Sequence, residues 1–134
     1  SPFLYWVIMF AQALVVAYGV AARTLKSRHS VLWKMQRISG SFLLVMVPAY
    51  FLFIPLSPSP EIEANFLVTG IQGLFLMAVY TLLLLSVLLH AGYGVWSVMS
   101  DYLASRNLRK GLAALVTFIT LIFAWIGLRA ILSI

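Results

Sequence analysis

The chain has 134 residues, of which 63% are hydrophobic and 9% are charged, and its mean hydropathy is +1.06. About a quarter of the residues are charged in an ordinary soluble domain, so this composition excludes that class and indicates an integral membrane protein. The formal net charge is +6, but the basic residues lie between apolar runs, where membrane topology places them, which argues against a nucleic-acid-binding protein. The chain has no cysteine, so any iron–sulfur cluster must belong to a partner.

Four apolar runs are each long enough to cross a bilayer, which needs about 20 residues of helix. They predict helices at about residues 2–22, 38–56, 66–99 and 111–133. The runs are continuous rather than alternating, which favours helices over the strands of a barrel. The sequence therefore predicts an all-α integral membrane protein, with residues 1–134 forming a single transmembrane domain of four helices. No basic segment precedes the first run, so we expect a retained helix rather than a signal peptide.

The first connection, residues 23–37, has five basic residues interleaved with apolar ones, a pattern typical of a segment at the membrane interface. In the second run, Pro48 predicts a kink and Pro55 an early stop, because proline lacks the backbone donor that a helix needs. The Ser-Pro-Ser-Pro sequence at residues 57–60 predicts a loop.

Charge is distributed unevenly over the connections. The middle connection, residues 57–65, has two glutamates and no basic residue, whereas the first and third connections are basic. The positive-inside rule then places both basic loops in the cytoplasm, or in the matrix of a mitochondrion, and both termini on the outer face. Arg129 alone departs from this pattern, and its long side chain can reach the outer headgroups.

His90 is the single titratable side chain in the apolar stretch of residues 66–99. An imidazole against lipid tails is costly unless a hydrogen-bond acceptor or a metal satisfies it. At about 100° per residue, His90, Gly94, Ser97 and Asp101 fall along one face of a helix. A histidine with a glycine one turn away suits a porphyrin, because the imidazole reaches the iron and the absent side chain leaves room for the macrocycle.

Polar residues gather at the end of the third predicted helix. Asp101 and Tyr102 lie there, and Gln36 and Arg37 open the antiparallel second helix at the same level. An acid, a phenol, an amide and a guanidinium form a suitable set for hydrogen-bonding a quinone carbonyl and delivering protons to it.

Other interpretations stay open at this point. A membrane histidine often packs between helices and bonds a carbonyl, an Asp-Tyr pair is often an interfacial anchor, and Arg37 can be a topology charge. A small transporter or channel component would use His90 and Asp101 as a proton relay, although the fourth helix offers only Thr117 and Thr120. A structural assembly protein without haem is a further alternative.

The pattern His-x3-Gly-x6-Asp-Tyr at residues 90–102 resembles the signature of the small, D-type membrane anchor of succinate dehydrogenase (respiratory complex II). Residues 33–40, which include Arg37-Ile38-Ser39-Gly40, are similar to the Arg-x-Ser-Gly opening of the first core helix in that complex's anchors. The family's anchors have three membrane helices, so residues 2–22 add one. Trp33 and Gln36 stand where the C-type anchors have their serine and histidine, which favours the D type.

The resemblance implies a role for each site residue. His90 would be one axial ligand of haem b, beside Gly94, and a second membrane anchor would supply the other histidine. Tyr102 would hydrogen-bond ubiquinone or menaquinone, Asp101 would support its protonation, and Arg37 would lie near the quinone or a haem propionate. The implied partners are that second anchor, an iron–sulfur subunit, a flavoprotein that oxidises succinate, and the lipids of a bacterial or mitochondrial inner membrane.

Overall fold

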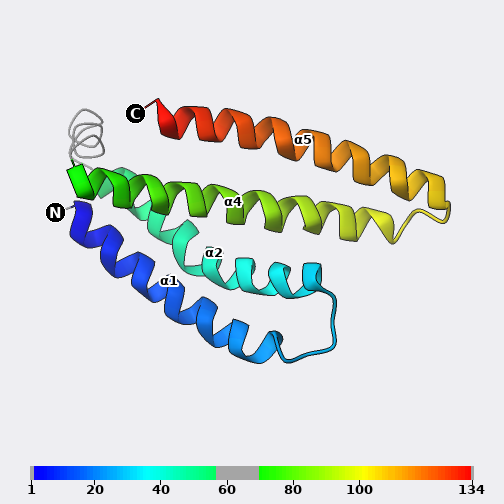
Figure 1. Cartoon of the computed structure of the whole chain (residues 1–134), viewed down its shortest axis with the longest axis horizontal. Coiled ribbons are helices and arrows are strands. Elements are labelled where there is room, and N and C mark those ends of the chain that lie inside the picture. Colours follow the sequence, from blue (N-terminus) through cyan, green and yellow to red (C-terminus); the bar gives the residue numbers. More distant parts are fainter. Residues whose placement is uncertain (1, 57–69, 134) are drawn as a thin grey trace.

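The computed structural model describes residues 2–56 and 70–133, which form four helices and, within these ranges, no strand. Helix α1 spans Pro2–Thr24, α2 spans Val31–Leu56, α4 spans Gly70–Ser100 and α5 spans Arg106–Leu132. All four are long and apolar enough to cross a membrane. The helices run back and forth, and both ends of the chain lie at the same end of the bundle (Figure 1). The predicted all-α fold with four membrane helices is thus confirmed.

Two helices begin earlier than hydropathy predicts. α2 begins at Val31 rather than near residue 38, and α5 begins at Arg106 rather than near residue 111. In α2, the Ser30 hydroxyl accepts a hydrogen bond from the Trp33 backbone N–H at 3.2 Å and so satisfies one free donor of the first turn. Hydropathy marks the part of a helix inside lipid, whereas the backbone bonds continue through polar residues beyond it. Residues 57–60 and 66–69, for which a loop and a helix start are predicted, lie outside the described residues.

Helix α2 bends partway along its length (Figure 1). This agrees with the kink predicted at Pro48, which removes one hydrogen bond from the interior of the helix. The helix is described as far as Leu56, so the stop predicted at Pro55 is not tested by the described residues. Residues of α2 on both sides of Pro48, including Phe42 and Phe53, belong to the buried core.

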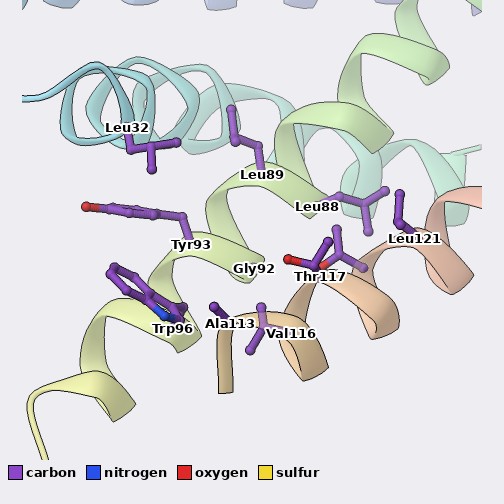
Figure 2. Close-up of a pocket in the computed structure, with 11 residues that line it drawn as sticks. Leu32, Leu88, Leu89, Gly92, Tyr93, Trp96, Ala113, Val116, Thr117 and Leu121 are labelled. Carbon is purple, nitrogen blue, oxygen red and sulfur yellow. The ribbon is translucent and has the colours of Figure 1, made fainter. Parts of the chain in front are cut away.

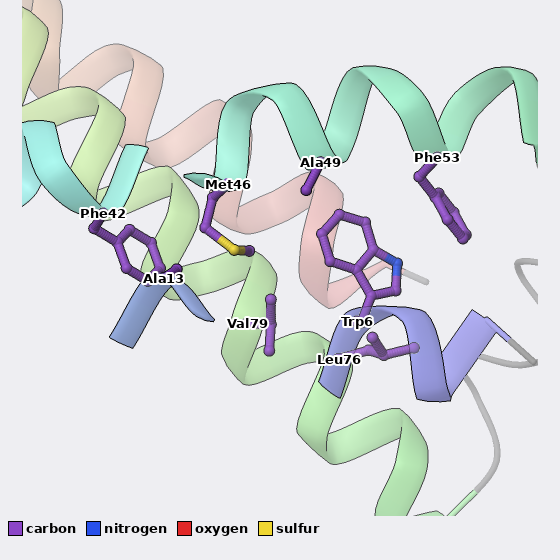
Figure 3. Close-up of a cluster of buried hydrophobic side chains, with 8 residues drawn as sticks. All are labelled: Trp6, Ala13, Phe42, Met46, Ala49, Phe53, Leu76 and Val79. Carbon is purple, nitrogen blue, oxygen red and sulfur yellow. The ribbon is translucent and has the colours of Figure 1, made fainter. Parts of the chain in front are cut away.

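The buried core lies between α1, the later part of α2 and the first half of α4 (Figure 3). Helix α2 packs against both α1 and α4, and α5 packs mainly against α4. Tyr5 fastens α1 to α2 by donating its hydroxyl proton to the Ala49 carbonyl at 2.5 Å. The buried hydrophobic side chains of this core are Trp6, Ala13, Phe42, Met46, Ala49, Phe53, Leu76 and Val79.

Trp6 is 0% exposed, and its ring lies 5.2 Å from that of Phe53 and 5.5 Å from that of Tyr80, measured between centroids. Replacing Trp6 by alanine is expected to cost about 3 kcal/mol of unfolding free energy, because helices within lipid are held together by packing. Thermal unfolding in detergent measures this loss. Trp125→Ala is the matched control, since Trp125 is 68% exposed. Equal melting temperatures of the two variants would show that the α1 contact contributes little.

Candidate functional site

A groove of about 570 Å³ lies between the first part of α2 and the second half of α4. These parts of α2 and α4 lie toward the end of the bundle where the α1–α2 and α4–α5 connections are found, opposite the chain termini (Figure 1). The groove brings together five residues that the sequence singles out, which are Gln36, Arg37, His90, Gly94 and Ser97. The full set of residues that line it is Trp33, Gln36, Arg37, Gly40, Ser41, Leu44, His90, Tyr93, Gly94, Ser97 and Val98.

His90 is held against α2 through one of its two ring nitrogens. Nδ1 lies 3.2 Å from the backbone carbonyl oxygen of Gln36 and 3.4 Å from Oγ of Ser39. A carbonyl only accepts hydrogen bonds, so the proton of the neutral ring is on Nδ1 and the lone pair is on Nε2. Nε2 has no hydrogen-bond partner among residues 2–56 and 70–133. The ring therefore offers one basic nitrogen for a further ligand.

Gly40 permits the close approach of His90 to α2. A Cβ atom at this position would lie 2.9 Å from Cε1 of the His90 ring, which is closer than real Cβ contacts. The neighbouring Ser39 is buried at 6% exposure and donates its hydroxyl proton to the Gln36 carbonyl at 3.1 Å. Neither Ser39 nor Gly40 was predicted to have a role of its own at the site, although the Arg-x-Ser-Gly pattern that contains them was the available signal.

Gly94 makes room for a protein side chain. A Cβ atom there would lie 3.3 Å from Nε2 of the Gln36 amide, so this amide occupies part of the space that the glycine leaves free. Oε1 of Gln36 is buried and has no hydrogen-bond partner in the described part of the chain. A buried acceptor without a partner is costly, so a donor from water or from a further chain at this groove would stabilise the Gln36 amide.

Arg37 lines the groove as an exposed cation near the start of α2. Its guanidinium carbon lies 4.9 Å from the centre of the Trp33 ring, and that ring stacks on His29 with centroids 3.9 Å apart. The stacked rings support the long side chain and leave its N–H donors available to an anionic or carbonyl group. His29 itself is exposed in the first connection, as the basic sequence around it suggests.

Asp101 and Tyr102 do not line the groove. Helix α4 ends at Ser100, and both residues lie in the turn that follows, where the Tyr102 backbone N–H bonds the Met99 carbonyl at 3.1 Å. Both are exposed, Tyr102 at 85%. The lining of the groove therefore includes the amide and the guanidinium of the predicted quinone set, but not the acid or the phenol.

The described residues contain no cluster of three or more His, Asp or Glu side chains that could hold a metal ion. The groove therefore supplies one metal-ligating side chain, and not a complete set of ligands.

A second groove, of about 370 Å³, lies between α4 and α5 and is mostly apolar (Figure 2). Tyr93 and Trp96 project into it from α4, and Ala113, Val116 and Thr117 face them from α5 (Figure 2). It contains no imidazole or carboxylate among its described lining residues, so these offer no ligand for a metal and no acid or base for proton transfer near neutral pH.

The fold and the groove define a multi-pass helical membrane protein that presents one basic imidazole nitrogen between two of its helices. The chain belongs to the succinate dehydrogenase/fumarate reductase transmembrane subunit family, whose model matches residues 20–128. It is similar to the succinate dehydrogenase hydrophobic membrane anchor subunit of Archaeoglobus fulgidus, with 29% identity over 114 residues, 82% of this chain and 97% of the relative. No solved structure matches the chain. The chain is therefore a membrane-anchor subunit. Most of α1 precedes residue 20, where the match to the family begins.

Proposed function

We propose that this membrane anchor binds haem b through Nε2 of His90, contributes to a quinone site, and helps to pass electrons from a partner iron–sulfur subunit to quinone. The observation that carries the haem assignment is the hydrogen bond from Nδ1 of His90 to the Gln36 carbonyl. Metal-bound histidines almost always donate their other ring N–H to a carbonyl, a carboxylate or water, which fixes the tautomer and raises the basicity of the bound nitrogen.

Three further features of the groove support this proposal. His90 is the only histidine within a membrane-spanning helix, so the second axial ligand would come from another membrane anchor. Arg37 places a positive charge at the groove, which suits a haem propionate or a quinone carbonyl. Gly40 lets the ring approach α2, because a Cβ atom there would lie 2.9 Å from Cε1 of His90. When bound, the haem would supply one-electron chemistry, which no side chain here provides.

The quinone assignment depends on residues at the end of α4. The Tyr102 hydroxyl is suited to donating to a quinone carbonyl, and the Asp101 carboxylate to passing protons from water. Because both are exposed and lie outside the His90 groove, we infer that partner proteins complete this part of the site. Succinate chemistry would take place on the flavoprotein partner. The α1–α2 connection and the first turns of α5, which carry Arg106, Arg109 and Lys110, would face the cytoplasm or matrix.

Tyr102→Phe removes the proposed quinone donor and nothing else. We expect quinone reduction by the purified complex to fall about tenfold, which is the upper range for one lost neutral hydrogen bond. Succinate oxidation with a soluble dye as acceptor should stay unchanged, because it does not need the anchor. Tyr18→Phe is the matched control, since Tyr18 is also exposed. Equal quinone reduction by the two variants would contradict the role of Tyr102.

The hydrogen bond of His90 also supports a second candidate function, because an imidazole bonded to a carbonyl is satisfied without a metal. The chain would then be a structural anchor without haem. The optical spectrum of the purified complex decides between the two. A b-type haem signal supports haem ligation, and a complex that is active with the dye acceptor but lacks this signal is the structural anchor.

A further inference from the structure

We propose that Ser39 is a positioning residue that, together with the Gln36 carbonyl, sets the orientation and basicity of the His90 ring. This inference rests on the proposed function, in which Nε2 of His90 binds the haem iron. Ser39 itself would touch neither haem nor quinone. It would act through the ring nitrogen on the far side of the imidazole.

The hydrogen-bond directions around Nδ1 support this role. The Ser39 hydroxyl gives its proton to the Gln36 carbonyl at 3.1 Å. Its oxygen lone pairs are then free to accept, and Oγ lies 3.4 Å from Nδ1 of His90, while the carbonyl lies 3.2 Å from the same nitrogen. The Nδ1–H group is thus shared between two acceptors on one turn of α2. Two acceptors restrict rotation of the imidazole more than a single one does.

The burial of Ser39 makes its contact with Nδ1 important for His90 as a haem ligand. Ser39 is 6% exposed, so water does not replace its hydroxyl if the side chain is lost. A hydrogen bond accepted from Nδ1–H increases the electron density at Nε2, which stabilises ferric relative to ferrous iron. Removing one of the two acceptors is therefore expected to raise the midpoint potential of the haem and to change the orientation of the ring.

The test is a potentiometric titration of the haem in the purified complex that contains Ser39→Ala. At the wild-type midpoint potential, we expect the ratio of reduced to oxidised haem to rise about threefold, as suits the loss of part of one hydrogen bond. The low-spin ferric signal in electron paramagnetic resonance should also shift, because it depends on the angle between the two axial imidazole planes. Neither readout changes if Ser39 only fills space.

Two variants make the test specific. Ser41→Ala is the matched control, because the Ser41 hydroxyl also lines the groove and bonds a carbonyl of its own helix, that of Ile38 at 2.7 Å. Ser39→Thr keeps the hydroxyl and should restore the wild-type potential and signal. A Ser39→Ala complex with the potential and signal of Ser41→Ala would overturn the inference, and so would a fall in potential.

The failure of this inference is distinguishable from the failure of the proposed function. If the wild-type complex contains no b-type haem, or keeps it after loss of His90, the haem assignment itself is wrong. If the haem depends on His90 but its potential does not depend on Ser39, only the positioning role is wrong.

Discussion

Replacing His90 by alanine is expected to reduce the haem content of the purified complex by roughly tenfold or more, since even residues that only support a metal ligand change affinity by about 10- to 100-fold. The variant loses the one nitrogen that the groove offers to iron. The chain's second histidine, His29, cannot take its place, because it lies in the connection before α2 and stacks on Trp33. The b-type bands of the optical spectrum measure the effect.

His29→Ala is the matched control for this experiment, and its spectrum should equal that of the wild type. Assembly is checked separately, by gel filtration and by succinate oxidation with a soluble dye, so that a missing haem is not confused with a missing complex. An assembled His90→Ala complex with the full b-type spectrum would show that the imidazole is structural, bonded to the Gln36 carbonyl and to nothing else.

Gly40→Ala is expected to have the second largest effect on the site. The added Cβ atom would lie 2.9 Å from Cε1 and 3.4 Å from Nδ1 of His90, so the ring has to move away from α2. This movement weakens the hydrogen bonds from Nδ1 to the Gln36 carbonyl and Ser39. We expect haem affinity to fall about tenfold, as for other losses of support behind a metal ligand.

This variant separates haem binding from helix stability. Alanine favours a helix over glycine by roughly 1 kcal/mol, so Gly40→Ala does not weaken α2 itself. Gly19→Ala is the control, because a Cβ atom there meets nothing within 4 Å. The ratio of haem to protein, measured for both variants after equal purification, gives the comparison. Equal ratios would mean that the ring has room to move without loss of the ligand.

The additional helix α1 has a structural consequence away from the site. Its aromatic side chains pack on the later half of α2 and the first half of α4, whereas the groove lies between the first part of α2 and the second half of α4. α1 thus stabilises the end of the bundle opposite His90. The Trp6 variant is accordingly expected to change melting temperature more than haem content.

Hydropathy was sufficient to predict the four helices because each run of apolar residues must satisfy its own backbone groups within lipid. It misplaced the starts of α2 and α5, because the helices begin directly after Ser30 and Ser105 and their first turns include charged residues that lower the local hydropathy. The kink of α2 was predictable because Pro48 acts on its own helix. α4 ends at Ser100, one residue after the predicted end of the third run.

The sequence by itself determined the fold class, the family motifs and the candidate ligand His90, because apolar run length and residue spacing along one helix are local properties. Only the tertiary structure decided which ring nitrogen is free, since the acceptors of Nδ1 belong to Gln36 and Ser39, more than 50 residues away in the chain. It also showed that Gly40 provides the space for His90. Hydrogen-bond direction and close packing depend on how α2 and α4 approach each other, and no pattern within a single helix contains that information.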